Sequence, residues 1–342
     1  MGIFLREIRI IGIILLLAGA AFGQRREQFE LEDAQYLGFH FDDDFLFAAN
    51  RDEQYTGGIA FEYLRAFQST NDTKKLLNPF GGGPRFWTAS FGSDLYTPYN
   101  LSDSLIILND RPYSSYTYLG IGLIAYDKSQ QKRLSGEFFL GIMGSDLPGQ
   151  VQIFVHQFGD SAPANGWIND IAQKETFVPN FRLTYQENLA RFKKIRLLPF
   201  KWLQIGSVAK LNVGLYLNSI SAGLKFSGFN RCPTSGVAFK NFKLRTDLSD
   251  EKTNKLKLTY YFQPQLQLIG YTTALQSLPW MDSPYFLTGD LINRAVVMLE
   301  AGVNLEYKRF RMSYTVQART KEFIKYRYDW HSWGGVTMGF SF

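Results

Sequence analysis

The chain has 342 residues, a net charge of +6 and a mean hydropathy of -0.16. Its single cysteine, Cys232, excludes an intramolecular disulfide and every metal site built from paired cysteines. Aromatic residues make up 16% of the chain, and such enrichment at this hydropathy is typical of strands whose side chains alternate between lipid and a polar lumen.

Residues 1–23 have the pattern of a secretory signal peptide. Two arginines precede an apolar run over residues 10–18, and small residues precede an expected cleavage site after Gly23. The run is shorter than the roughly 20 residues that a spanning helix needs, and no later segment supplies one. We therefore expect residues 24–342 to form one domain that enters a membrane only as a β-barrel.

The strands are marked by period-2 alternation and by aromatic and β-branched residues. Twelve strands are predicted, at residues 35–47, 57–68, 86–96, 115–127, 132–143, 178–191, 199–211, 214–226, 255–268, 294–307, 310–322 and 332–342. The number is even, as in bacterial single-chain barrels, so the fold class is all-β: a 12-stranded antiparallel transmembrane β-barrel. A soluble β-sandwich is the alternative.

The connections predict which end of the barrel faces outward. Tight turns at 127–132 and 307–311 would be periplasmic, and the longer segments 97–114, 144–177 and 269–293 would be outward loops. The stretch 227–254 is long where a short turn is expected. The last strand ends in Phe340 and Phe342 on one face, which resembles the terminal strand of outer-membrane barrels.

Strand 35–47 carries three consecutive carboxylates, Asp42, Asp43 and Asp44. Alternation places Asp43 with the lipid-facing residues, where an unpaired carboxylate is costly away from the interface. Three adjacent carboxylates repel one another unless they are protonated or bind a cation, and calcium prefers oxygen ligands. The triplet therefore predicts a calcium site, against the alternative of a solvated strand end.

The next strand begins with Tyr55, Thr56 and two glycines, which allow a bulge or a close backbone approach. The hairpin brings Thr56 near Asp43 and Asp44, because it joins the two strands.

The loop at 144–177 contains a predicted short helix with a histidine. Apolar residues at 151, 154, 155 and 158 recur at helical spacing, with Asp146 and Pro148 as start signals. Alternation at 151, 153 and 155 leaves a strand open as the alternative. Gln152 and His156 stand one turn apart on the helix, so the amide can orient the imidazole.

His156 is a candidate general base for ester hydrolysis. A neutral imidazole takes a proton from water while a nearby calcium ion stabilises the oxyanion, and no serine nucleophile is needed. The chain has only three histidines. His40 is expected to be a polar lumen residue, and His331 lies at the mouth of the last strand among interface aromatics; neither is expected to be catalytic.

Nine short motifs run in order from about residue 35 to the end of the chain. They are Asp42-Asp43-Asp44-Phe45, Asp52-x-x-Tyr55-Thr56-x-Gly58, Tyr96-Thr97-Pro98, Asp110-Arg111-Pro112-Tyr113, Gly141-x-x-Gly144, Gln152-x-x-x-His156, Gly166-Trp167, Lys321-Glu322-Phe323 and His331-x-Trp333-Gly334. In this set the chain resembles the outer-membrane lipid A 3′-O-deacylases.

The resemblance implies an outer-membrane enzyme that hydrolyses the 3′-linked acyloxyacyl ester of lipid A with calcium. It implies an active site on the outer side, between the barrel wall and a helix from an extracellular loop. The site residues carried over by motif are His156, Gln152, Asp44 and Thr56, with Asp43 and Asp44 as the metal ligands. We expect lipid A as the partner and a monomeric barrel.

Two positions depart from the family pattern. Asp43 stands where the family has Asn, and Asp94 aligns with a basic residue of the family. A carboxylate at the second position would repel a lipid phosphate, so we hypothesise a substrate without a phosphate there. The competing interpretations are a phospholipid acyl-ester hydrolase and a non-catalytic barrel.

Overall fold

The computed structural model describes residues 35–47, 53–66, 79–157, 163–193, 201–230 and 256–342. The expected signal peptide, Cys232 and most of the stretch 227–254 lie outside these residues. Within the described ranges, no helix is long and apolar enough to cross a membrane.

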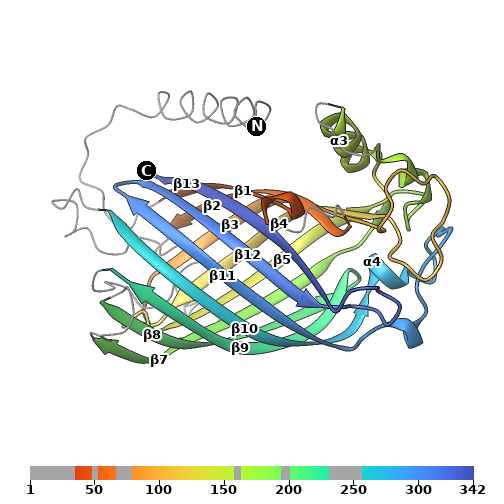
Figure 1. Cartoon of the computed structure of the whole chain (residues 1–342). Coiled ribbons are helices and arrows are strands. Elements are labelled where there is room, and N and C mark those ends of the chain that lie inside the picture. Colours follow the sequence, from red (N-terminus) through yellow and green to blue (C-terminus); the bar gives the residue numbers. More distant parts are fainter. Residues whose placement is uncertain (1–34, 48–52, 67–78, 158–162, 194–200, 231–255) are drawn as a thin grey trace.

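Twelve antiparallel strands form the wall of a closed barrel, as predicted (Figure 1). The first strand, β1, pairs with the last, β13, and so closes the sheet. The wall strands are β1 (Gln35–Asp43), β2 (Gln54–Ala66), β3 (Arg85–Thr97), β4 (Ser114–Tyr126), β5 (Lys132–Met143), β7 (Asn180–Lys193), β8 (Trp202–Gly214), β9 (Leu217–Phe229), β10 (Lys257–Thr272), β11 (Ala295–Tyr307), β12 (Phe310–Thr320) and β13 (Trp330–Ser341). The two-residue strand β6 (Thr176–Phe177) adds to the end of β5.

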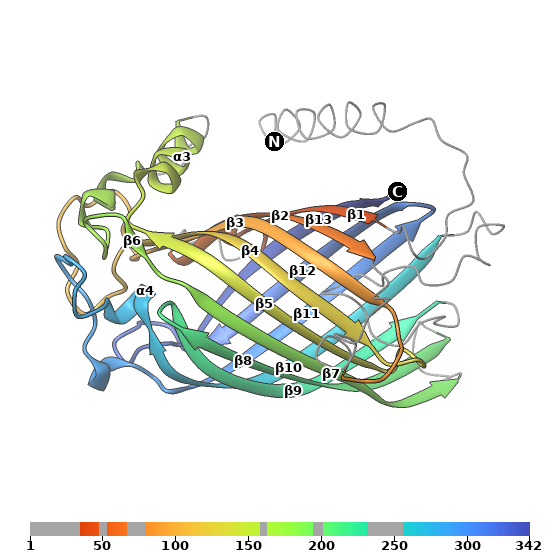
Figure 2. The ribbon, with the colours of Figure 1, turned by 180° about the vertical axis from the view of Figure 1, so that it is seen from behind.

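The two ends of the barrel differ. The start of β1 and the end of β13 lie at one end of the barrel, together with the tight turns after β4 and β11. The helices lie at the opposite end (Figure 2). Short turns mark the periplasmic end of such barrels, so the helix-bearing loops face outward.

The described residues form five short helices at the outer end. They are η2 (Asp44–Leu46), α3 (Asp146–His156), η3 (Asn165–Asn169), α4 (Thr273–Gln276) and η5 (Gly289–Leu291). The predicted helix is confirmed by α3. Asp146 and Pro148 fall in its first turn, where an acidic side chain suits the helix dipole and a proline removes no helical hydrogen bond.

The predicted strands differ from the observed ones by a few residues at several ends, and at the end of the first strand the difference changes the type of element. The first strand ends at Asp43, and residues Asp44–Leu46 form the short 3-10 helix η2. Phe45 and Phe47 continue the alternation of aromatic residues, so the period-2 pattern alone could not show that the strand ends at Asp43.

Side chains on the wall alternate as a transmembrane barrel requires. Leu119 and Ile121 of β4 are exposed on the outer surface, where lipid would cover them. Inside, a polar lumen also contains an apolar cluster near the periplasmic end, made of Tyr36, Leu64, Ala66, Phe86, Ile124 and Tyr126.

Candidate active site at the outer rim

Helix α3 is joined to the neighbouring helix η3 by a part-buried polar contact between two side chains. The indole Nε1 of Trp167 donates to Oε1 of Gln152 at 2.7 Å, and the Gln152 side chain is only 8% exposed. The Trp167 ring also packs edge-on against Tyr113, with centroids 5.2 Å apart. The side chain that was predicted to orient His156 is thus itself held in place, while the predicted bond between Gln152 and His156 stays a prediction.

Gly149 allows this close packing. A Cβ atom at Gly149 would lie 2.8 Å from Cδ2 and 2.9 Å from Cγ of Trp167. These atoms belong to the rigid part of the indole, so they cannot move aside easily. The glycine in the first turns of α3 therefore serves the contact between the two helices.

The rest of α3 presents an apolar face outward. Leu147, Val151 and Phe154 are exposed and follow helical spacing, and the helix packs against β3 and β4 of the wall. His156 is the last residue of α3 and is partly buried. The imidazole therefore lies at the end of an amphipathic helix that rests on the outer end of the wall.

Asp44 is fixed by its environment at the start of η2. Its side chain is 2% exposed, and Oδ2 accepts a hydrogen bond from the backbone N–H of Glu53 at 3.2 Å. The Glu53 carboxylate, which is fully buried, accepts from Arg327 at 2.9 Å and from the Tyr326 hydroxyl at 3.3 Å. Burial raises the pKa of Glu53, and the Arg327 guanidinium opposes that rise.

The three consecutive aspartates do not form one cluster. Asp42 points into the lumen, where it bonds His40 at 2.9 Å and the Tyr55 hydroxyl at 2.6 Å. Asp43 lies opposite Gly57, whose added Cβ would meet Asp43 Oδ2 at 3.2 Å. Alternation and the turn into η2 thus direct the three side chains differently, and the calcium site at Asp43 and Asp44 stays a prediction.

Thr56 sits at a bulge between Tyr55 and Gly57, as the paired glycines predicted. It is buried, and its hydroxyl donates to the carbonyl of Leu95 in β3 at 3.2 Å. The same bulge lies beside the pairing of Asp43 with Gly57. Thr56 thus connects the β1–β2 hairpin, which carries Asp43 and Asp44 and is called the aspartate hairpin below, to β3, against which α3 packs.

The sequence-predicted residues therefore occupy adjoining parts of the outer rim. Asp43, Asp44 and Thr56 belong to the β1–β2 hairpin, and Gln152 and His156 belong to the helix on β3 and β4. Among the residues that the structure describes, no group of three or more His, Cys, Asp or Glu side chains is assembled for a metal ion.

The calcium hypothesis can still be tested against the donor set. Asp43 and Asp44 offer carboxylate oxygens, the ligand type that calcium prefers, and Asp44 is held by a main-chain bond rather than left mobile. Two carboxylates supply only part of the roughly six to eight oxygens that calcium takes, so main-chain carbonyls and water would complete its shell. The residues fit the ion in chemical type.

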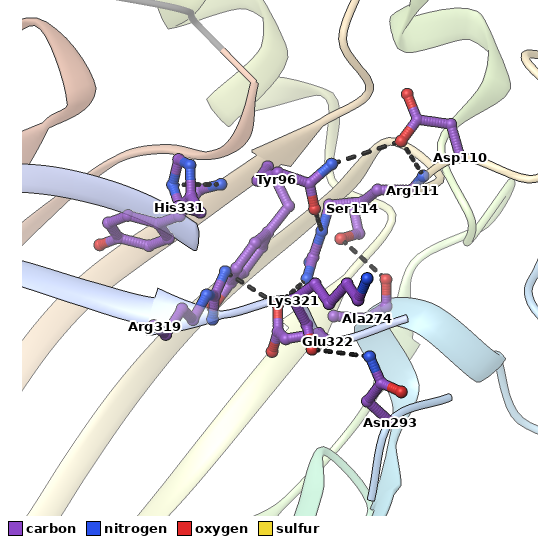
Figure 3. A network of polar contacts seen from close by, with 12 residues as sticks. Tyr96, Asp110, Arg111, Ser114, Ala274, Asn293, Arg319, Lys321, Glu322 and His331 are labelled. Carbon is purple, nitrogen blue, oxygen red and sulfur yellow. Dashed lines mark hydrogen bonds and ion pairs between the residues drawn. The ribbon is translucent and has the colours of Figure 1, made fainter. Parts of the chain in front are cut away.

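A polar network between the loops lies at the same end of the barrel (Figure 3). Arg111, which is 1% exposed, pairs with Glu322, and Arg319 shares that carboxylate at 2.9 Å. Arg111 Nε also donates to Gln54 Oε1 at 3.0 Å, and Gln54 donates to Asp110 at 3.3 Å. Burial lowers the pKa of Arg111, and Glu322 opposes that effect.

The sequence marks Arg111 as part of a motif but does not reveal the partners of its side chain. Arg111 and Glu322 are 211 positions apart in the chain. Their only sequence signal was membership in the ordered set of motifs.

The two other histidines lie inside the barrel. His40 bonds Asp42 and the Thr337 hydroxyl, as expected of a lumen residue. His331 is buried, accepts from the backbone N–H of Tyr55 at 3.4 Å and stacks on Trp333. It belongs to the interior packing rather than to a belt of interface aromatics.

Asp94 also faces the lumen. It accepts from the Tyr55 hydroxyl at 3.3 Å, next to Asp42. This position does not support the hypothesis that Asp94 repels a lipid phosphate at the outer surface, because its carboxylate is directed into the barrel.

Comparison with known proteins identifies the family. The family described as "Outer membrane protein LpxR" matches residues 10–342. The solved structure of LpxR from Salmonella typhimurium is similar with a TM-score of 0.68 at 15% identity, covering 89% of this chain and 99% of that one.

Other solved structures are less similar. The β domain of the Bordetella autotransporter BrkA has a TM-score of 0.43 at 9% identity, covering 90% of this chain and 99% of that one. No curated protein matches. Because the family match spans nearly the whole sequence, this chain belongs to the LpxR family of outer-membrane lipid A 3′-O-deacylases and is a hydrolase of the outer membrane.

Proposed function

We propose that this chain hydrolyses the 3′-linked acyloxyacyl ester of lipid A, with His156 as the general base that activates water. The observation that supports the proposal is the position of His156. It is the last residue of α3, which the contact between Gln152 and Trp167 holds and which packs against β3. Thr56 of the β1–β2 hairpin contacts the same strand.

The chemistry assigned to His156 is proton transfer. A neutral imidazole nitrogen removes a proton from water as the oxygen attacks the ester carbonyl, and it then returns the proton to the leaving sugar oxygen. Gln152, one turn earlier on α3, would position the imidazole. In mutagenesis of other enzymes, such a base contributes roughly 100-fold to 10,000-fold to the rate.

Asp43 and Asp44 would hold a calcium ion, which supplies positive charge beside the developing oxyanion when it is bound. Asp44 contributes a carboxylate fixed by the Glu53 backbone N–H. Thr56 would line the same site from the bulge in β2. Its hydroxyl proton is directed to the Leu95 carbonyl, which leaves its oxygen lone pairs for a ligand.

The apolar surface beside the site suits a lipid substrate. Leu147, Val151 and Phe154 of α3 are exposed, and so is Phe177 of β6, above the lipid-facing wall of β5. Acyl chains could contact this surface without leaving an apolar environment, while the polar head of lipid A remains at the outer rim.

The test is a mass measurement on the folded barrel. The detergent-folded protein is incubated with lipid A, with calcium or with a chelator, beside His156→Ala and a matched surface control, Gln157→Ala. We expect loss of an acyloxyacyl mass that requires calcium and His156 and that the control retains. Activity of His156→Ala equal to wild type would remove the proposed base. Release of fatty acid from phospholipid alone would favour a phospholipid hydrolase, and no product from either lipid would favour a non-catalytic barrel.

A further inference from the structure

A buried arginine lies at the opposite, periplasmic end of the lumen. Arg311, the second residue of β12, is 2% exposed, and its Cζ atom lies over the Tyr36 ring, 5.8 Å from the ring centroid. Among the described residues, its Nε and Nη1 atoms have no hydrogen-bond acceptor. A guanidinium stays charged at all relevant pH values, so burying it without an acceptor is costly.

Further donors surround this guanidinium. Ser313 is the next inward residue of β12 and is 1% exposed, and its hydroxyl likewise has no partner in the part of the chain that is described. On another part of the wall, Tyr126 of β4 pairs in register with Arg133 of the adjacent strand β5. Arg133 is also buried, and its Nη1 donates to Oε1 of Gln186 at 3.2 Å. Tyr126 belongs to the same apolar cluster as Tyr36, and its hydroxyl has no partner among the described residues.

The acidic residue directly opposite Arg311 does not form an ion pair with it. Glu306 lies opposite Arg311 in the register of β11 and β12, but its carboxylate is 4.0 Å from Lys257 Nζ. Arg311 has no ion pair with a described residue. Two nitrogens of a buried guanidinium, a serine hydroxyl and a tyrosine hydroxyl at this end of the lumen thus have no hydrogen-bond partner among the described residues, which is the composition of a site for an anion.

We propose that the periplasmic end of the lumen binds a small oxyanion, such as inorganic phosphate, with Arg311 as the central ligand and Ser313, Arg133 and Tyr126 around it. An anion would satisfy the N–H groups of Arg311 and balance its charge, whereas water could do only the first. The site is separate from the outer rim and does not depend on the proposed function.

The test follows thermal unfolding of the full, detergent-folded chain as inorganic phosphate replaces chloride at constant ionic strength. A ligand that binds the folded state raises the unfolding midpoint and saturates. We expect a saturable rise for wild type and for the exposed control Arg191→Met, and an apparent phosphate affinity at least about tenfold weaker for Arg311→Met, because hydrogen bonds to charged groups are among the strong ones.

Two further variants keep the test decisive if Arg311→Met does not fold. Arg311→Lys retains the charge but loses the planar donors, and Ser313→Ala removes one hydroxyl, so each should weaken the phosphate response. A wild-type midpoint that ignores phosphate, or variants that respond as wild type does, would overturn the proposal and leave water as the partner of these donors.

Discussion

At the scale of single residues, Trp167 makes the side-chain contact that holds α3. Its Nε1 donates to the buried oxygen of Gln152. Trp167→Phe keeps most of the ring but leaves that oxygen without its donor, which should cost about 1–3 kcal/mol of local stability. We expect reduced deacylase activity and faster amide hydrogen exchange in α3, while Trp280→Phe, at an exposed position, should change neither. Equal exchange in both variants would count against this role.

Asp170 gives the outer loops a pH dependence. Burial raises its pKa to about 7, and backbone hydrogen bonding from Ala172 opposes the rise. Because the folded pKa exceeds the usual value of about 3.9, its stabilising contribution is complete below about pH 4 and is lost as the pH rises through 7.

Asp170→Asn should therefore flatten this part of the stability profile and stabilise the fold above pH 7. The amide oxygen of asparagine can still accept from Ala172. The check is the unfolding midpoint measured from pH 4 to 8, with Asp282→Asn, an exposed site, as the control. A wild-type profile that rises across this range would contradict the assignment.

At this scale the sequence predicted the catalytic candidates but not their supports. Gln152 and His156 are visible as a pair because they stand one helical turn apart. The partner of Gln152 is 15 positions away and that of Arg111 is 211 positions away. Such contacts depend on how the loops fold over the barrel, and a local sequence pattern carries no information about that.

At the scale of elements, α3 contains Gly149, a residue that by its helix propensity alone should destabilise the helix. Gly149→Ala should stabilise an isolated helix by roughly 0.5–1 kcal/mol. The structure predicts the opposite sign, because the new Cβ would approach the Trp167 ring to 2.8 Å. We expect a lower unfolding midpoint and lower activity for Gly149→Ala.

The control is Gln150→Ala, at an exposed position of the same helix, which should be neutral or slightly stabilising. A stabilised Gly149→Ala protein would show that α3 and η3 are not packed as described.

The strands could be predicted well because inward and outward side chains alternate along them. The exception is the end of β1, where aromatic residues continue the alternation although the chain turns into η2 at Asp44. The bulge at Thr56 could be anticipated from Gly57 and Gly58. Its consequence, a hydrogen bond to Leu95 in the next strand, required the register of β2 and β3.

At the scale of the whole molecule, the barrel separates a lipid-facing surface from a polar lumen. Leu266 and Gln267 are neighbours in β10; the first is 50% exposed on the outer face, and the second bonds Ser219 inside. Leu266→Lys should cost about 2–4 kcal/mol near the bilayer midplane, whereas Gln267→Lys should cost much less. Urea unfolding in phospholipid vesicles measures both. Equal costs would contradict the assignment of the two faces.

We infer that α3 and the β1–β2 hairpin form one active site, although they are separate in sequence. The test is a double-mutant cycle, with deacylase rates measured for His156→Ala, Asp44→Asn and the double variant. Residues that act as a unit are strongly non-additive, so we predict that the double variant is about as slow as the slower single variant. Rate losses that multiply would contradict a shared site and would leave Asp44 with a structural role only.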